Sequence, residues 1–240
     1  MFWRILASQA WHKWHITLLL WVAMTALVSL YVYLGNSARF SNRSMQLVMK
    51  NMGHNLLILP KQADPFDVYL CTDKQRLFPA DVTARMAGHR RLASKYYTSV
   101  LQQRVAIGGR GVILTGIEPV FRGDETAEKA HLTTPVPAGH VRLGAAAAGG
   151  LKVAEGDAVA VLSRTYGVSE VLDPLGTLDD YRVYLPLGEC QELLGKPGQI
   201  NAVWSFLCLH GASLEGVSRR QEAQFAKLFP DYRIIAQTRI

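Results

Sequence analysis

Residues 16–34 read ITLLLWVAMTALVSLYVYL and contain no charged side chain. An α-helix of this length spans about 28 Å at 1.5 Å per residue, close to the ~30 Å hydrocarbon core of a bilayer. Aromatic residues, which prefer the membrane–water interface, flank the stretch: Trp11, Trp14 and Trp21 at one end, Tyr31 and Tyr33 at the other. The sequence therefore predicts one transmembrane helix at residues 16–34 that tethers the rest of the chain to a bilayer.

The main alternative to a membrane anchor is a cleaved signal peptide. The apolar core of a signal peptide usually has about 7–15 residues, and this run is longer, so we favour a retained anchor preceded by a short cytoplasmic segment, residues 1–15. The flanking charges do not set its orientation, because they occur on both sides: Arg4 and Lys13 before it, Arg39, Arg43 and Lys50 after it. A large domain can cross the membrane largely regardless of such charges, so an extracytoplasmic domain is compatible with the sequence.

The composition predicts a folded chain with one anchor plus one large domain or two small subdomains. Of the 240 residues, 49% are hydrophobic and 19% are charged, which is typical of folded proteins. The formal charge is +7, but Lys and Arg are scattered, so nucleic acid is not a predicted partner. The three cysteines show no CxxC spacing and are expected to be small buried side chains: Cys71, Cys190 and Cys208.

Residues 35–53, directly behind the anchor, are predicted to continue as a stalk helix. One helical face would carry the apolar residues Met45, Val48, Met49 and Met52. Gly53 can end this helix. We interpret the methionine stripe as packing surface rather than as a ligand site.

Residues 54–240 alternate between strand and helix patterns, which predicts an α+β domain. The predicted strands are residues 54–59, 96–107, 112–120, 158–163, 166–172, 181–185, 200–209 and 232–235. The predicted helices are 79–87, a short alanine helix within 141–151 ended by Gly149-Gly150, 187–194, and 213–228 with Ser213 as its N-cap. Residues 108–111 read as a hairpin turn, 61–78 as a loop, and 121–139 as a boundary before an inserted second subdomain at about 139–200.

No catalytic, cofactor-binding or metal-binding residue is predicted. The glycine-rich loop at 108–111 lacks the Lys-Ser/Thr pair of a P-loop, and no GxSxG nucleophile elbow occurs. Asp179 and Asp180 could pair with Glu118 as acid and base, but adjacent carboxylates in a turn are usually only solvated. The histidines behind the anchor lack HxxxH and HExxH spacing: His54, His89, His131, His140 and His210.

Several segments follow the anchor in a recognisable order. They are NLLILP at 55–60, GIEP at 116–119, VRLGAAAAGGLKVAEGDAVAVL at 141–162, YGVSEVLDPLGTLDDYRVYLPLGECQELLG at 166–195 and INAVWSF at 200–206. This order resembles the MacB-like periplasmic core domain of ABC transporter permeases, a group that includes lipoprotein-release and FtsX-like permeases. The strongest part is residues 141–204, where the matching positions are mostly turn and core residues: Gly144, Gly156, Asp157, Val168, Asp179, Asp180, Leu185, Pro186 and Leu187.

The resemblance implies an extracytoplasmic domain of two α+β subdomains behind the first span of a permease in the bacterial inner membrane. Such a permease works as a homo- or heterodimer with a cytoplasmic ABC ATPase, which alone binds ATP, and a periplasmic adaptor would be a further partner. Its function is export or mechanotransmission, coupling ATP hydrolysis to movement outside the membrane, and the chain itself would be no enzyme.

The sequence departs from this family in its number of spans. No second apolar run of spanning length follows Leu34. The chain is therefore expected to be either the N-terminal part of a longer permease or a single-span relative. The alternative function is that of a single-span extracytoplasmic sensor or scaffold protein.

Overall fold

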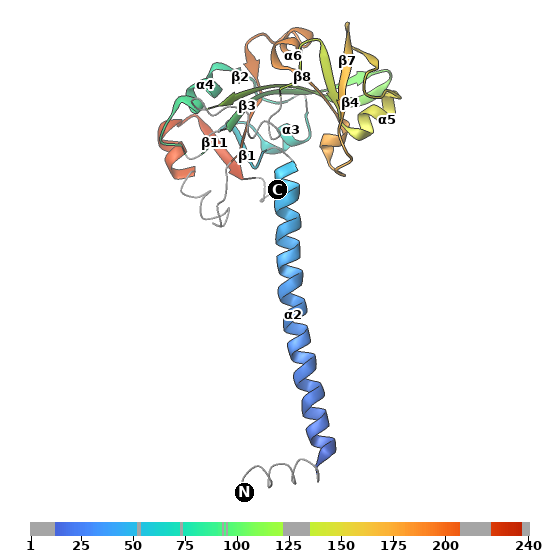
Figure 1. Cartoon of the computed structure of the whole chain (residues 1–240). Coiled ribbons are helices and arrows are strands. Elements are labelled where there is room, and N and C mark those ends of the chain that lie inside the picture. The colour runs from blue at the N-terminus through green and yellow to red at the C-terminus, as the bar shows by residue number, and fades with distance from the viewer. Residues whose placement is uncertain are drawn as a thin grey trace. The chain divides into compact units, whose positions relative to one another are not determined.

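The structure is a computed structural model that describes residues 13–51, 54–72, 74–92, 94, 96–121, 135–206 and 222–236. It divides into two compact units, Met1–Asn51 and Met52–Ile240. In the first unit, α2 (Trp14–Asn51) is one continuous helix of 38 residues (Figure 1). Within it, Trp14–Ser37 is long and apolar enough to cross a membrane, judged by length and composition.

The side chains along the first part of α2 are apolar and exposed. Leu19 is 71% exposed, Trp21 70% and Tyr31 80%, so this surface has no protein partner within the described residues. The predicted apolar N-terminal helix is therefore confirmed, whereas its division into a span and a stalk stays a prediction. The predicted methionine face lies outside the described side chains, as does Gly53.

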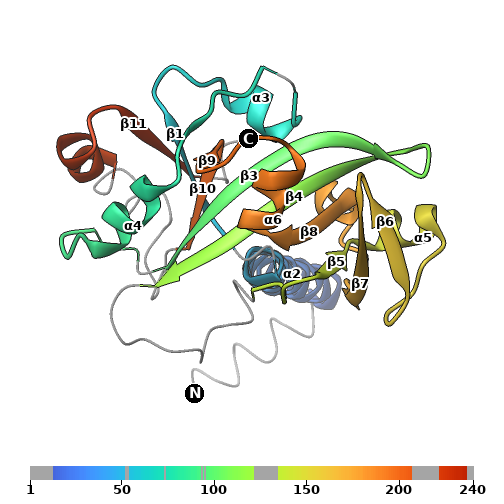
Figure 2. The ribbon, with the colours of Figure 1, turned by 90° about the horizontal axis from the view of Figure 1, so that it is seen from above.

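The second unit, which we call the soluble domain, is built on a nine-stranded sheet (Figure 2). Its strands are β1 (Leu56–Pro60), β3 (Tyr96–Ile107), β4 (Arg110–Phe121), β5 (His140–Leu143), β6 (Ala158–Val161), β7 (Arg164–Val171), β8 (Arg182–Pro186), β10 (Ala202–Phe206) and β11 (Tyr232–Ala236). Their order is β11-β1-β10-β3-β4-β8-β5-β7-β6. A second, two-stranded sheet pairs β2 (Phe78–Pro79) with β9 (Gln199–Ile200).

The long hairpin of β3 and β4 forms the middle of the sheet. Every residue from Tyr96 to Ile107 is paired, ending at Ile107 opposite Arg110. The turn residues Gly108 and Gly109 have φ values of 54° and 75°, which a two-residue turn of this kind requires and which glycine adopts without a steric penalty. The predicted hairpin is therefore confirmed.

The sheet is mixed, because two parallel pairs lie among antiparallel ones. β4 pairs with β8 in parallel, β8 with β5 antiparallel, and β5 with β7 in parallel. Strands and helices are interleaved in the chain, and the predicted α+β class is confirmed. Because β8 is bonded directly to β4, one continuous sheet runs through residues 139–200 and their neighbours, and the predicted subdomain division stays a prediction.

The helices differ from the sequence prediction in three places. Residues 61–78, predicted as a loop, contain α3 (Pro65–Tyr69), which Asp64 caps by accepting a hydrogen bond from the Phe66 N–H at 2.9 Å. The alanine helix, α5 (Ala145–Leu151), runs through both glycines and ends at Lys152, whose φ is 57°. The helix predicted from Pro79 begins later, as α4 (Asp81–Gly88).

Two further helices follow the prediction as far as the structure describes them. The helix predicted at 187–194 is α6 (Leu187–Leu193). Of the helix predicted at 213–228, residues 222–228 are helical, and Ser213 lies outside the described residues. Phe225 from this segment is 1% exposed and belongs to the main core cluster.

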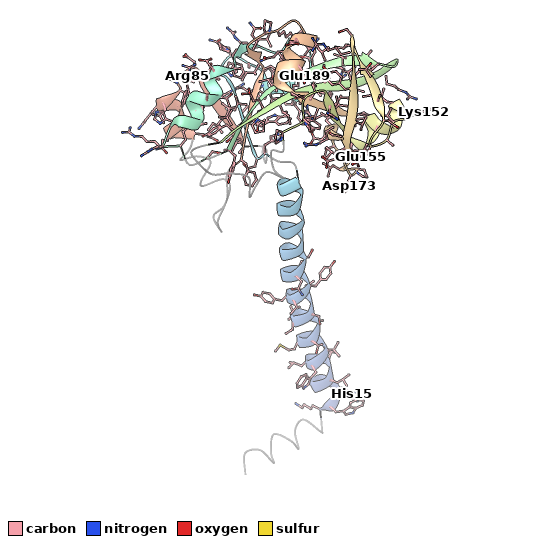
Figure 3. The ribbon with its side chains drawn as sticks, turned by 45° about the horizontal axis from the view of Figure 1, so that its top comes forward. His15, Arg85, Lys152, Glu155, Asp173 and Glu189 are labelled. Atoms are coloured by element: carbon pink, nitrogen blue, oxygen red, sulfur yellow. The ribbon has the colours of Figure 1, made fainter. Side chains whose placement is uncertain are left out.

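The core of the soluble domain lies on both faces of the sheet. One cluster holds Leu101, Leu114, Val183 and Leu185 from the central strands, and a smaller one holds Leu57, Val68, Ile117 and Tyr184. Charged residues, among them Arg85, Lys152, Glu155 and Asp173, lie on the outer surface (Figure 3). The soluble domain thus has the polar surface and apolar interior that α2 lacks.

Candidate functional site

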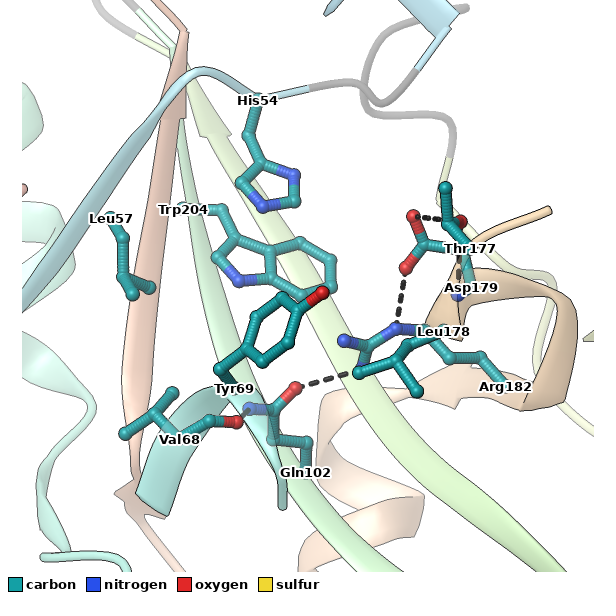
Figure 4. Close-up of a pocket in the computed structure, with 10 residues that line it drawn as sticks. All are labelled: His54, Leu57, Val68, Tyr69, Gln102, Thr177, Leu178, Asp179, Arg182 and Trp204. Carbon is teal, nitrogen blue, oxygen red and sulfur yellow. Dashed lines mark hydrogen bonds and ion pairs between the residues drawn. The ribbon is translucent and has the colours of Figure 1, made fainter. Parts of the chain in front are cut away.

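A cavity of about 110 Å³ opens in the soluble domain where five distant segments of the chain meet (Figure 4). We call it the Arg182 pocket. Two lining residues come from β1 and the chain just before it, His54 and Leu57, and two from α3, Val68 and Tyr69. Strand β3 contributes Gln102 and β10 contributes Trp204. The turn before β8 and the start of β8 contribute the rest: Thr177, Leu178, Asp179 and Arg182. Most of this lining is apolar. Four of its polar residues belong to one hydrogen-bonded network: Gln102, Thr177, Asp179 and Arg182.

Arg182 is the centre of that network, although its residue is only 7% exposed. Its Nε donates to Oδ1 of Asp179 at 2.6 Å, and its Nη1 donates to Oε1 of Gln102 at 2.7 Å and to Oγ1 of Thr115 at 3.0 Å. A charge this deeply buried requires a paired and hydrogen-bonded partner. Removing one partner of such a pair typically costs about 3–5 kcal/mol.

Gln102 fixes the position of the network within the sheet. Its Nε2 donates to the Val68 carbonyl at 2.5 Å, which ties β3 to α3. Its backbone N–H donates to Oδ1 of Asn201 at 3.0 Å, and Nδ2 of Asn201 donates back to the Gln102 carbonyl at 2.7 Å. The side-chain oxygen that receives Arg182 is therefore held by contacts on both sides of β3.

Aromatic rings form one wall of the Arg182 pocket. Trp204 and His54 are stacked, with ring centroids 4.2 Å apart and an interplanar angle of 3°. The Cζ atom of Arg182 lies 5.3 Å from the centroid of the Trp204 ring, within the range of a cation–π interaction. His54, the first described residue after α2, is thereby packed into the wall of the pocket.

The Asp179–Asp180 pair, interpreted from the sequence as a solvated turn, is largely buried, so that interpretation is wrong. Asp180 is 9% exposed and accepts hydrogen bonds from the N–H groups of Leu175 at 2.9 Å and Gly176 at 2.8 Å. The Asp179 carboxylate contacts Arg182, and Glu118 is exposed on β4. The carboxylates are thus structural acceptors that build the turn before β8.

Gly144 allows this turn to approach the sheet closely. A Cβ atom at Gly144 would lie 2.2 Å from the Asp179 carbonyl and 2.5 Å from the Asp180 carbonyl, distances that no side chain can adopt. The Gly144 N–H donates to the Arg182 carbonyl at 2.9 Å. The glycine is therefore required by the same turn that positions Asp179 and Arg182.

Burial raises the pKa of several groups around the site. Burial, followed by the negative charge of Asp179, raises the pKa of Tyr184, whose hydroxyl lies 3.4 Å from Oδ1 of Asp179. Burial also raises the pKa of the Cys71 thiol and raises the pKa of Cys190 to about 12. Thiols with raised pKa values are poor nucleophiles at neutral pH.

The cysteines and histidines singled out in the sequence do not meet in one site. Cys71 and Cys190 are free and buried, as predicted, and Cys208 lies outside the described residues. His89 packs edge-on against Phe229, and Nδ1 of His140 lies 3.0 Å from the Ala138 carbonyl. Within the described residues no three His, Cys, Asp or Glu side chains are grouped as a metal site would need. His131 and His210 lie outside them.

Comparison with known proteins identifies the fold through solved structures. No family model and no curated protein matches the chain. The periplasmic region of MacB from Actinobacillus actinomycetemcomitans is similar over 79% of this chain and 92% of that chain, with 12% sequence identity and a TM-score of 0.50. The soluble domain has the MacB periplasmic fold.

A second similar structure is the extracellular domain of the noncanonic ABC-type transporter YknZ from Gram-positive bacteria. The similarity covers 76% of the present chain and 98% of the YknZ domain, with 13% sequence identity and a TM-score of 0.46. The fold assignment rests on the MacB region, whose score is higher. This similarity to the MacB region confirms the fold that was expected from the motif order between residues 141 and 204.

The Arg182 pocket was not found by sequence reasoning. Arg182, Gln102 and Trp204 lie far apart in the chain, and neither periodicity nor a local motif joins them. The only local signals were Asp64-Pro65, which begins α3, and the Asp179-Asp180 dipeptide.

Proposed function

We propose that this chain is a permease-type membrane subunit, or the N-terminal part of one, in an ABC transporter of the export or mechanotransmission kind. One observation supports it: a helix long enough to span a bilayer ends two residues before a domain with the MacB periplasmic fold. In this proposal α2 is the first span of the permease. The soluble domain is extracytoplasmic, at the inner membrane of a bacterium.

The connection between α2 and the soluble domain suits a mechanical role. After Asn51 only Met52 and Gly53 separate the helix from His54 in the Arg182 pocket and from the Asn55 N–H, which donates to the Ser205 carbonyl at 3.2 Å. The chain then enters β1, whose five residues are all buried between β10 and β11. A displacement of α2 would therefore act on an interior strand of the sheet rather than on a loose loop.

The proposal assigns the chemistry to partners. A cytoplasmic ABC ATPase would bind and hydrolyse ATP, a second permease subunit of like or unlike sequence would complete the dimer, and a periplasmic adaptor would be a further contact. The chain itself would be no enzyme and would hold no cofactor. In support, the carboxylates Asp179 and Asp180 are engaged in structural hydrogen bonds.

Purification of the tagged full chain from native membranes in mild detergent tests this function. We expect an ATPase with a Walker motif to be recovered with it, identified by mass spectrometry, and ATP hydrolysis in the purified complex. The matched control is the chain with Leu19→Arg and Leu27→Arg. This variant should neither be recovered in the membrane fraction nor co-purify with the ATPase.

Recovery of the chain without an ATPase, under conditions in which a known transporter of the same cells keeps its own, would contradict the proposal. If an extracytoplasmic protein is recovered in place of the ATPase, the single-span sensor or scaffold becomes the better account.

A further inference from the structure

A second cavity of the soluble domain, of about 230 Å³, is lined almost entirely by polar side chains. It lies where the chain after α3, strand β3 and the segment between α6 and β10 meet, and α6 and β9 lie beside β3 (Figure 2). Four of its seven lining residues are amides, and the lining has one charged side chain, that of Lys196. We call it the Lys196 cavity. Its walls differ from those of the Arg182 pocket, which are mostly apolar.

The end of α6 fixes the position of Lys196. Gly195 has a φ of 64° and follows the last turn of the helix, and the Lys196 N–H donates to the Gln191 carbonyl at 2.8 Å, as in a Schellman motif. The half-buried Lys196 side chain donates from Nζ to Oε1 of Gln103 on β3 at 2.7 Å. The ammonium group is therefore held in place at the wall of the cavity.

This ammonium group has donors left over. It carries three N–H groups, and within the described residues only Gln103 accepts from it. Nε2 of Gln103, in the same side-chain amide, makes no hydrogen bond to a described residue, and no described carboxylate pairs with Lys196. A carboxylate in the cavity would accept from Nζ of Lys196 and from Nε2 of Gln103 together, and would neutralise the charge.

The loop after α3 contributes an acceptor that lacks a donor. Nε2 of Gln75 donates to the carbonyls of Thr72 at 3.0 Å and of Gln102 at 3.3 Å. Because both of these partners are acceptors, they decide which end of the amide is nitrogen. The buried Oε1 of Gln75 then has no hydrogen-bond partner among the described residues. A buried acceptor of this kind is satisfied when a hydroxyl group donates to it.

Together these groups select the chemistry of a ligand. The lining presents one positive charge, several amides and only one apolar side chain, Leu77, so the best match is a molecule with one negative charge and several hydroxyl groups. The cavity is larger than the ~150 Å³ cavity that holds benzene, and scaling from benzene gives room for roughly nine non-hydrogen atoms. We propose that the Lys196 cavity binds a small hydroxylated carboxylate, whose carboxylate group accepts hydrogen bonds from Lys196 and Gln103. This inference does not depend on the proposed ATPase partner.

L-Threonate, a small acid with several hydroxyl groups, is the probe for a test on the full chain in lipid nanodiscs. Titration followed by ligand-observed NMR should show saturable binding, with a Kd on the order of 1 mM for a ligand of this size. L-Threitol replaces the carboxylate by a neutral hydroxymethyl group, and butyrate lacks the hydroxyl groups. Each should bind at least about tenfold more weakly than threonate. Nanodiscs without the protein give the background.

Two substitutions test where threonate binds. Lys196→Gln removes the charge, and Gln103→Glu gives the ammonium group a carboxylate partner within the chain, so each should weaken threonate binding at least about tenfold. Lys74→Gln is the matched control, because Lys74 is exposed in the loop between Thr72 and Gln75 but does not line the cavity. It should leave binding unchanged, and near-ultraviolet circular dichroism checks that each variant is folded.

Several outcomes would overturn the proposal. An absence of saturable binding would mean that the cavity holds only water. Equal affinity for threonate and threitol, or for threonate and butyrate, would contradict the assigned chemistry. Binding that Lys196→Gln leaves intact, or that Lys74→Gln weakens equally, would assign the anion to the general positive charge of the surface instead of the cavity.

Discussion

Helix α2 exposes apolar side chains, whereas the Arg182 pocket buries a charged one, and both arrangements are unfavourable by themselves. Along α2 large apolar side chains are fully open, as at Leu19 and Tyr31, and they become favourable only when hydrocarbon replaces water around them. In the pocket, a charged group is withdrawn from water and becomes favourable only through its partners, Asp179 and Gln102. The helix therefore depends on its environment, and the pocket depends on an exact set of contacts within the chain.

The largest expected effect comes from placing charges in α2. Leu19→Arg together with Leu27→Arg should cost at least about 3 kcal/mol of membrane insertion, because an arginine near the centre of a span, as at position 27, costs about 2.5–3.5 kcal/mol, and one nearer the end, as at position 19, adds a smaller cost. Fractionation after alkaline carbonate extraction should find this variant outside the membrane pellet, with its soluble domain still resistant to protease. Leu19→Ile with Leu27→Ile is the control and should stay in the pellet. Pelleting of the double arginine variant would show that α2 is not the anchor.

The second-largest effect is expected from disrupting the hydrogen-bonded network of the Arg182 pocket. Arg182→Met leaves Asp179 largely buried without its cation, and should lower the free energy of unfolding by about 3–5 kcal/mol. Urea unfolding in detergent, followed by near-ultraviolet circular dichroism, measures this. Arg164→Met is the matched control, because Arg164 forms an exposed ion pair with Glu192 at 2.9 Å, and such pairs contribute about 0–1 kcal/mol. Similar losses for both variants would contradict the role given to Arg182.

The third effect compares two glycines near α5. Gly144→Ala should destabilise the soluble domain by about 3 kcal/mol, since its new methyl group would collide with the main chain at Asp179 and Asp180. Gly149→Ala, inside α5 with open space around it, should instead be neutral or stabilising by up to about 1 kcal/mol. Thermal unfolding of the two variants under the same conditions separates these cases. Equal midpoints would contradict the close packing at Gly144.

The smallest effect concerns pH. The pKa of Tyr184 is raised in the fold by burial and by Asp179, so the unfolded chain loses this proton first as the pH rises above about 10. The contribution of Tyr184 to stability is therefore complete below that pH and falls above it. Tyr184→Phe should cost about 1 kcal/mol or less at neutral pH, and should lose less stability than the wild type between about pH 9 and pH 11. Parallel slopes would show that Tyr184 does not titrate in this range.

The same contrast explains how far the sequence predicts the structure. The apolar part of α2 and the β3–β4 hairpin follow from neighbouring residues: an uncharged run of spanning length in one case, and Gly108-Gly109 between two strand patterns in the other. Asp64-Pro65 is also a local helix start. We nevertheless predicted a loop there, because α3 has only five residues, Pro65–Tyr69, and so shows no helical periodicity.

The pocket could not be predicted in this way. Gln102 and Arg182 are 80 residues apart in the chain, and they meet only because β8 joins β4 in parallel within the mixed sheet. No spacing rule gives that pairing. For the same reason the Asp179–Asp180 pair was interpreted as solvated, because the sequence does not show that Gly144 allows the turn to close against the sheet.

The account depends most on one claim, that α2 crosses the membrane and leaves the soluble domain outside the cell membrane. Lys74→Cys, at an exposed position of the domain, and Ser8→Cys, before α2, test it in a Cys208→Ser background with a membrane-impermeant maleimide. The account predicts that Lys74→Cys is labelled on intact cells and that Ser8→Cys is labelled only after lysis. The reverse pattern, with Lys74→Cys protected until lysis, would contradict it.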